Sequence, residues 1–185
     1  MEVNPSTTLY TLGRGIVSIG TWSGTTPPVS YTDVGNSPSF EVEITEEKLE
    51  HKLSRTGTGT IDKEIVLLTG YTANFVLDEI SVANLAKFLK GTISGALSHI
   101  VSANTALTNE YAIKFVSDNP AGPNETWEFW RVTLSPNGAF NLISDEWAQL
   151  PFTAKGLSDI TNNASSPYFT VTFATTTTTT TTTTT

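Results

Sequence analysis

The side chains that could do chemistry in this chain are carboxylates and histidines, because the sequence contains no cysteine. Glu41 and Glu43 lie two positions apart in the alternating segment 39–44. In a strand they share one face at a spacing of about 7 Å. Two carboxylates at that distance suit glycoside hydrolysis or the binding of a hard cation. The alternation favours a simpler interpretation, in which both belong to the solvated face of a strand.

The two histidines offer little for catalysis. His51 lies between Glu50 and Ser54, which are the residue types of a hydrolytic triad. Neighbouring strand residues point to opposite faces, so Glu50 is badly placed to orient His51. His99 has no acidic neighbour in its segment. We therefore expect a protein that is not an enzyme, with no catalytic residue, no bound metal and no cofactor.

Composition excludes several other classes of protein. The 185 residues include 10 Lys and Arg against 18 Asp and Glu, which gives a formal net charge of −8. A protein that grips nucleic acid needs the opposite sign to neutralise phosphates. No apolar stretch approaches the roughly 18 to 20 residues of a membrane span. Residues 1–5 lack the basic flank and apolar run of a secretory signal, so we expect synthesis in a cytoplasm.

The elements that must position Glu41 and Glu43 form an extended hairpin. Ser39–Ser54 begins with a strict alternation of apolar and acidic residues, and Asp62–Leu77 is a second β-rich stretch. We expect the second strand to bulge at Gly70. The polar loop Arg55–Thr60 joins the two strands and has no apolar anchor.

One helix is expected, over residues 81–90, with Ser81 as its N-cap and Gly91 at its end. Residues 92–100 fit either a loop or a short strand, and 136–138 (Pro-Asn-Gly) predict a tight hairpin turn. The remaining strands are expected at Arg14–Trp22, Glu110–Ser117, Glu125–Ser135, Ala139–Ile143, Glu146–Ala154 and Tyr168–Ala174.

This pattern predicts a mainly β protein: a β-sandwich or partly closed barrel with one flanking helix and a long hairpin. We expect a single domain over residues 1–174, of which 1–12 form an N-terminal arm. Residues 175–185 are all threonine and form a C-terminal tail without apolar residues for a core.

An ordered set of short segments resembles a known family. The segments are Gly-Arg-Gly-Ile-Val at 13–17, Tyr-Thr-Asp-Val-Gly-Asn at 31–36, Glu-His-Lys-Leu-Ser at 50–54, Asp-Glu at 78–79, Asn-Leu-Ala at 84–86 and Gly91. Their order is similar to that of the major tail tube protein of long-tailed, siphovirus-like bacteriophages. The resemblance covers Gly13–Gly91, about half of the chain.

The resemblance implies six protomers in a ring, and rings stacked into a hollow, non-contractile tail tube of the virion. The hairpin strands would line the lumen, with Glu41 and Glu43 facing it. The inter-ring loop would comprise Arg55, Thr56, Gly57, Thr58, Gly59 and Thr60. Partners would be further copies and other tail proteins, such as the tape measure, tail tip and terminator. DNA would pass through without specific binding.

The residues fit this role independently, because carboxylates along a channel repel phosphates and leave DNA mobile. Two other functions stay open. A hydrolase would act through Glu41 and Glu43. A carbohydrate-binding, adhesin-like β-sandwich would use tryptophan platforms. The candidates for such platforms are Trp22, Trp127, Trp130 and Trp147.

Overall fold

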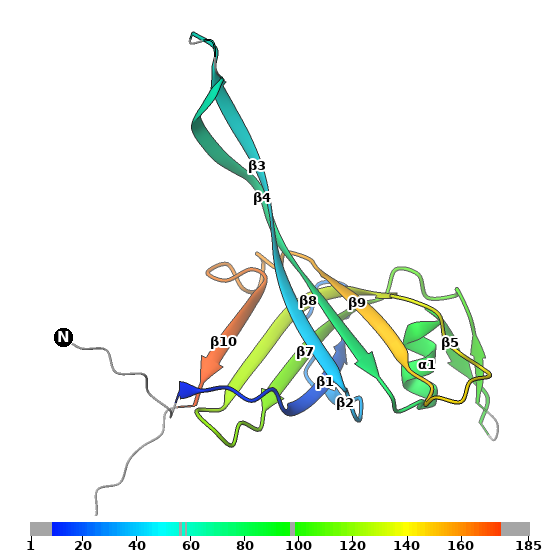
Figure 1. Ribbon diagram of the computed structural model, residues 1–185. Coiled ribbons are helices and arrows are strands. Elements are labelled where there is room, and N and C mark those ends of the chain that lie inside the picture. Colours follow the sequence, from blue (N-terminus) through cyan, green and yellow to red (C-terminus); the bar gives the residue numbers. More distant parts are fainter. Residues whose placement is uncertain (1–8, 56, 58, 97–98, 175–185) are drawn as a thin grey trace, which may run out of the picture.

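The computed structural model describes residues 9–55, 57, 59–96 and 99–174. These residues form ten strands and one short helix (Figure 1). In chain order the elements are β1 (Gly15–Thr21), β2 (Thr32–Asp33), β3 (Ser39–Leu53), β4 (Thr60–Leu77), α1 (Val82–Phe88), β5 (Thr92–Ser94), β6 (Ile100–Ser102), β7 (Glu110–Ser117), β8 (Glu125–Pro136), β9 (Leu150–Gly156) and β10 (Phe169–Phe173).

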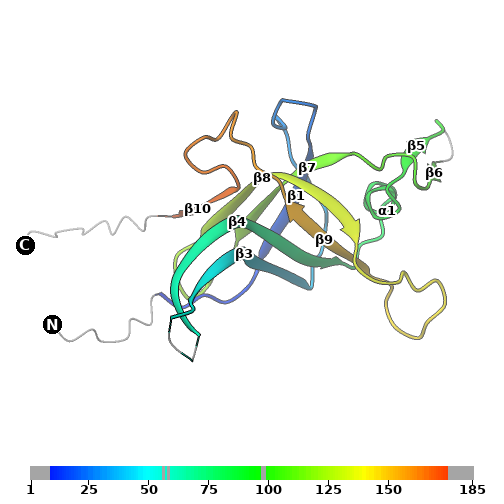
Figure 2. The ribbon, with the colours of Figure 1, turned by 90° about the horizontal axis from the view of Figure 1, so that it is seen from above.

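Eight of the strands form one antiparallel sheet in the order β2-β1-β7-β8-β9-β4-β3, with β10 also paired to β8. The sheet branches along β8. Residues 125–129 of β8 pair with β10, whereas residues 132–136 pair with β9. The branched sheet curls over a core without closing into a barrel (Figures 1 and 2). The prediction of a mainly β fold with one flanking helix and a long hairpin is confirmed.

The core lies inside the curl and is rich in aromatic rings. Phe75 of β4 and Phe129 of β8 are almost fully buried. Phe40, from the last strand of the sheet, stacks on Phe115 of β7 with ring centroids 5.6 Å apart. This contact brings the β3 end of the sheet over its β7 part. The fold is therefore held by packing across the curl as well as by strand pairing.

Helix α1 is capped as expected but is shorter than the predicted 81–90. The Ser81 side chain accepts a hydrogen bond from the backbone N–H of Asn84 at 3.1 Å. At the other end Lys90, rather than Gly91, adopts a positive φ of 47°. Gly91 is needed for another reason, since a Cβ there would lie 2.5 Å from the carbonyl oxygen of Ser102 in β6. Strands β5 and β6 form a small separate hairpin beside the helix.

The prediction of a strand at 139–143 is wrong, as is the tight turn at 136–138. Residues 137–149 form a long loop between β8 and β9. Leu142 and Ile143 are 83% and 97% exposed in this loop, so the apolar residues of the segment are not buried against the core. The predicted strand 146–154 begins only at Leu150.

The hairpin differs from expectation in its irregularities. Gly70 pairs in register with Thr45, so the predicted bulge there is wrong. The register shifts leave Leu67 and Asp62 as the extra residues of β4. Thr60 is the first residue of β4 rather than the end of the loop. Thr56 and Thr58 of the predicted loop lie outside the described residues, as do residues 1–8 and the threonine tail 175–185.

No helix within the described ranges is long and apolar enough to cross a membrane.

Candidate functional site

The first candidate surface is the polar outer face of strands β3, β4, β9 and β8. Alternate residues of these strands point into the core, and the residues between them face outward. Strand register aligns the outward residues in two rows across the sheet. One row is Glu43, Thr72, Lys155 and Thr133, and the other is Glu41, Asn74, Thr153 and Ser135. We call these eight residues the polar face.

Glu41 and Glu43 are both exposed and lie on the face opposite Phe40 and Val42, which pack against the core. Strand β3 is the last strand of the sheet, so one of its edges has no partner among the described strands. Sequence reasoning missed Lys155, which stands two strands away from Glu43 in the same row. The polar face therefore combines two carboxylates with one ammonium group.

Small hydroxyl and amide side chains fill the rest of the polar face. The hydroxyl of Thr153 donates to Oδ1 of Asn74 at 2.7 Å, which links β4 to β9. These groups make a smooth hydrophilic surface without apolar side chains. Such a surface suits contact with water and sliding polymers better than the binding of a small ligand, which normally needs a concave, largely apolar site.

The second candidate surface is the outer half of the β3–β4 hairpin. Strand β9 pairs with β4 only as far as Thr72. Beyond this point β3 and β4 pair with each other alone, up to the last pair, Leu53 with Thr60. Figure 1 shows this part of the hairpin projecting far beyond the sheet. We call residues 44–53 and 60–71 the projecting hairpin.

The projecting hairpin carries apolar side chains on both faces. Leu49 and Ile65 form one cross-strand pair, and Val66 lies opposite Lys48 on the other face. Seven large apolar side chains are between 45% and 61% exposed: Ile44, Leu49, Ile61, Ile65, Val66, Leu67 and Leu68. Exposed apolar area of this extent indicates an interaction surface.

Ion pairs occupy the polar positions of the projecting hairpin. Lys48 lies 3.0 Å from Glu64 and 3.4 Å from Glu46. The hydrogen bonds that Lys48 donates to the carboxylates of Glu64 and Glu46 raise the pKa of its ammonium group. His51 Nδ1 lies 2.5 Å from Asp62 Oδ1, although strand register places Lys63 opposite His51 and leaves Asp62 as an extra residue of β4. Exposed pairs of this kind contribute little to stability.

The described residues of the predicted inter-ring loop lie at the far end of this hairpin (Figure 1). Arg55, Gly57 and Gly59 are exposed, and Thr60 begins β4. The structure thus brings these loop residues to the point of the molecule farthest from the core.

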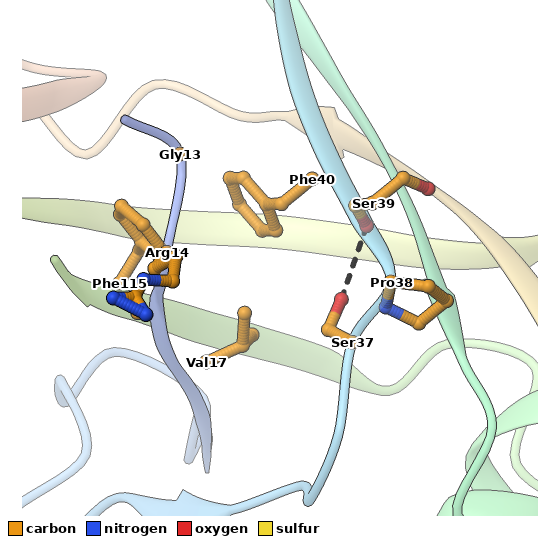
Figure 3. Close-up of a pocket in the computed structure, with 9 residues that line it drawn as sticks. Gly13, Arg14, Val17, Ser37, Pro38, Ser39, Phe40 and Phe115 are labelled. Atoms are coloured by element: carbon orange, nitrogen blue, oxygen red, sulfur yellow. Dashed lines mark hydrogen bonds between the residues drawn. The ribbon is translucent and has the colours of Figure 1, made fainter. Parts of the chain in front are cut away.

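A shallow cleft of about 100 Å³ marks the seam where the curled sheet fails to close, between β1 and the start of β3 (Figure 3). Phe40 and Phe115 line it on the core side, and Ser37 Oγ donates to the Ser39 carbonyl at 3.0 Å. Arg14 is the only charged residue among those lining it. This cleft offers no pair of groups for acid–base or nucleophilic chemistry.

The structure does not assemble a tryptophan platform. Trp22 is buried, and Trp130 donates its indole N–H to the Ser166 carbonyl at 2.9 Å. Trp127 is half-buried and stacks on the rings of Phe129 and Phe169. Trp147 alone is almost fully exposed, in the loop 137–149. No group of three or more His, Asp or Glu side chains converges within the described ranges.

Comparison with known proteins places the chain in a family. A family model described as "Protein of unknown function UCP028589" matches residues 10–109 and 96–172, so the chain belongs to this family. No curated protein matches it. A solved structure, the sheath-tube complex of the PVC extracellular contractile injection system in its extended state, is similar to 87% of this chain and to 89% of its own matching chain. The identity is 13% and the TM-score is 0.45.

Proposed function

We propose that the chain is a structural subunit of a phage-type tail tube, in which six copies form a ring and rings stack into a hollow conduit for the genome. The observation that carries the proposal is the projecting hairpin. The family resemblance of Gly13–Gly91 supplies the ring architecture.

A two-stranded hairpin is marginally stable in water unless it packs on something. The projecting hairpin has no third strand and exposes apolar residues such as Leu49, Ile65 and Leu68 on its surface. Strand β3 also ends the sheet, so one of its edges has no partner among the described strands. A neighbouring copy that pairs with this edge and covers the apolar residues satisfies both requirements.

The polar face becomes the lining of the channel in this proposal. Each protomer contributes the carboxylates of Glu41 and Glu43 and the ammonium group of Lys155 to it, and Lys90 donates to Ser135 at its margin, with Nζ 3.2 Å from Oγ. The β3 side of the lining, where both carboxylates lie, is negative. Negative charge repels the phosphates of passing DNA, while the Thr and Asn side chains hydrate the wall. DNA then moves through the tube without specific binding.

The tip of the hairpin, Arg55–Thr60, reaches the next ring in the stack. Its described residues are exposed and lie at the end of the hairpin, as an axial contact requires. Further partners are the tape measure, tail tip and terminator proteins of the same tail, and the protein resides in the virion. The role is structural and needs no cofactor.

Sedimentation velocity at rising concentration, followed by negative-stain microscopy, tests the proposal. We expect rings or tubes, nucleated where necessary by assembled tail tips. The double variant Leu49→Asp, Ile65→Asp should stay monomeric, because both side chains are exposed in the monomer and covered in the tube. Val29→Asp is the matched control, since Val29 is 99% exposed but lies outside the hairpin. A chain that stays monomeric even with tail tips present would overturn the proposal.

A further inference from the structure

The loop 137–149 exposes a cluster of large apolar side chains, which we call the knob. Leu142, Ile143 and Trp147 are 83%, 97% and 94% exposed. Isolated exposed apolar residues are common, but three large ones within six positions of one loop are not explained by the fold. The knob lies outside the polar face and the projecting hairpin, so the proposed channel does not use it.

The knob also carries two carboxylates, Asp145 and Glu146. The backbone N–H of Glu146 donates to Ser144 Oγ at 2.8 Å, which fixes the turn that presents them. Neither carboxylate has a Lys, Arg or His partner within 4.0 Å in the described part of the chain. The knob is therefore apolar and acidic together.

A second unmatched apolar surface lies on the N-terminal arm and the end of β10. Leu9, Tyr10, Leu12 and Phe173 are between 53% and 69% exposed, and we call them the arm patch. Arg14 follows directly in the chain, is exposed, and has no carboxylate within 4.0 Å among the described residues. The arm patch is therefore apolar, with the Arg14 guanidinium near it in the chain and the Glu125 carboxylate at the end of β10, where Glu125 pairs with Phe173 and accepts a hydrogen bond from Thr11 Oγ1 at 3.3 Å.

The arm is held in place although its side chains face solvent. Asn119 is only 7% exposed, and its amide bonds the arm twice. Its Oδ1 accepts from the Leu12 N–H at 3.1 Å, and its Nδ2 donates to the Tyr10 carbonyl at 3.0 Å. A buried side chain thus fixes an exposed apolar segment. Such preorganisation lowers the entropy cost of binding a partner.

The knob and the arm patch lie at opposite ends of the molecule. In Figures 1 and 2 the arm and β10 are at one end, and the loop between β8 and β9 is at the other end, near α1. One copy therefore cannot satisfy both surfaces by folding back on itself. A second copy placed head to tail brings knob and arm patch together.

We propose that the knob of one copy packs against the arm patch of the next copy, with Trp147 as the apolar anchor and Asp145 and Glu146 beside Arg14. The inference rests on the proposed self-assembly and specifies which surfaces make the contact. Tryptophan and tyrosine are enriched among the residues that dominate interfaces. A contact between two different patches propagates from copy to copy, and it closes into a ring when the rotation allows.

Because the sequence contains no cysteine, cysteines introduced by substitution are the only thiols that a cross-linker can join. The double variant Leu12→Cys, Ile143→Cys is treated with a bis-maleimide under assembling conditions. We expect a ladder of covalent oligomers, because each copy offers one thiol to each neighbour. A mixture of the two single variants should give dimers and no longer products.

Val29→Cys combined with Ile143→Cys is the matched control and should give no ladder, since Val29 is fully exposed but lies outside the arm patch. Dimers of Ile143→Cys alone would show a symmetric contact and overturn the proposal. Rings or tubes that form without a Leu12–Ile143 ladder would also overturn it, while leaving the tail tube function standing. Failure of every sample to assemble would instead contradict the proposed function.

Trp147→Ala gives an independent readout. The side chain is 94% exposed, so the circular dichroism spectrum and melting temperature of the monomer should not change. Association measured by sedimentation should weaken by roughly tenfold or more, the loss typical of an interface anchor. An unchanged association constant would contradict the proposal.

Discussion

Buried amide side chains hold the loops of this protein to its sheet. Asn84 is 3% exposed, and its Nδ2 donates to the carbonyl of Val34 at 2.8 Å and to that of Glu79 at 3.0 Å. The first bond joins helix α1 to the segment after β2, and the second joins it to the connection between β4 and α1. Asn119 does the same for the N-terminal arm. At the residue scale, a few buried, hydrogen-bonded amide groups hold the loops beside a largely aromatic core.

Asn84→Ala should lower the free energy of unfolding by about 2 kcal/mol, because the change leaves buried carbonyl groups without their donor. Urea denaturation of the monomer measures the effect. Asn137→Ala is the control: this residue is exposed, its side-chain bond is long at 3.5 Å, and we expect a change within about 0.5 kcal/mol. Equal effects of the two substitutions would show that the buried bonds are unimportant.

The charge of the polar face gives a second prediction at the residue scale. Replacing Glu41 and Glu43 together by Lys should leave the monomer folded, since both side chains are exposed. Assembled tubes of this variant should retain short duplex DNA at low salt and release it at high salt, because Lys–phosphate contacts depend on counterion release. Tubes of the unmodified chain should retain none.

The matched control for that experiment replaces the same two residues by Gln. This removes the negative charge without adding a positive one, so we expect no retention of DNA. Retention of DNA by tubes of the unmodified chain would place Glu41 and Glu43 elsewhere than on the channel wall.

Sequence patterns predicted some of these residues and missed others. The outward position of Glu41 and Glu43 follows from strict alternation with Phe40 and Val42. Lys155 was missed because its place in the same row as Glu43 depends on the pairing of β9 with β4, two strands that lie far apart in the sequence. The exposure of Trp147 was not evident either, because apolar residues in a strand and in a loop look alike without the core.

Among the elements, the β3–β4 hairpin matters most for the proposed function. Both of its strands were predictable, because the alternation of apolar and polar residues, the turn residues between the segments and the length of each segment all indicate a hairpin. The prediction of a strand at 139–143 is wrong because the alternation of apolar and polar residues there is too short to bury one face of a strand. In the structure this segment is part of a loop outside the sheet. The bulge predicted at Gly70 is wrong because Gly70 packs close to Thr45, with which it pairs in regular strand register. A glycine in a strand signals either a bulge or a close approach, and sequence cannot distinguish the two.

The hairpin tip gives a prediction at this scale. Replacing Arg55–Gly59 by Asn-Gly keeps a short connection between Leu53 and Thr60 and leaves the strand pairs intact. The monomer should unfold at the same urea concentration as the unmodified chain. Rings should still form, but stacking into tubes should be lost in electron micrographs.

A control for the tip is a Gly-Ser loop of the original length, which keeps the reach of the hairpin and removes its side chains. Stacking that survives this change would show that backbone reach matters more than side-chain identity. Tubes of normal length from the shortened hairpin would contradict an axial role for the tip.

For the molecule as a whole, composition and alternation were sufficient to predict the fold class. They were insufficient for the branched sheet, because the pairing of β10 with β8 joins segments that no local pattern connects. Within the described residues, three apolar surfaces have no internal partner: the projecting hairpin, the knob and the arm patch. We propose that they serve association with further copies of the chain.

Cryo-electron microscopy of the assembled protein tests the central claim most directly. The account predicts rings with sixfold symmetry, stacked along one axis, in which the hairpin strands line the channel. Glu41, Glu43 and Lys155 should face that channel. Assemblies with the hairpin on the outer wall, or a chain that forms no rings with or without tail tips, would contradict the account.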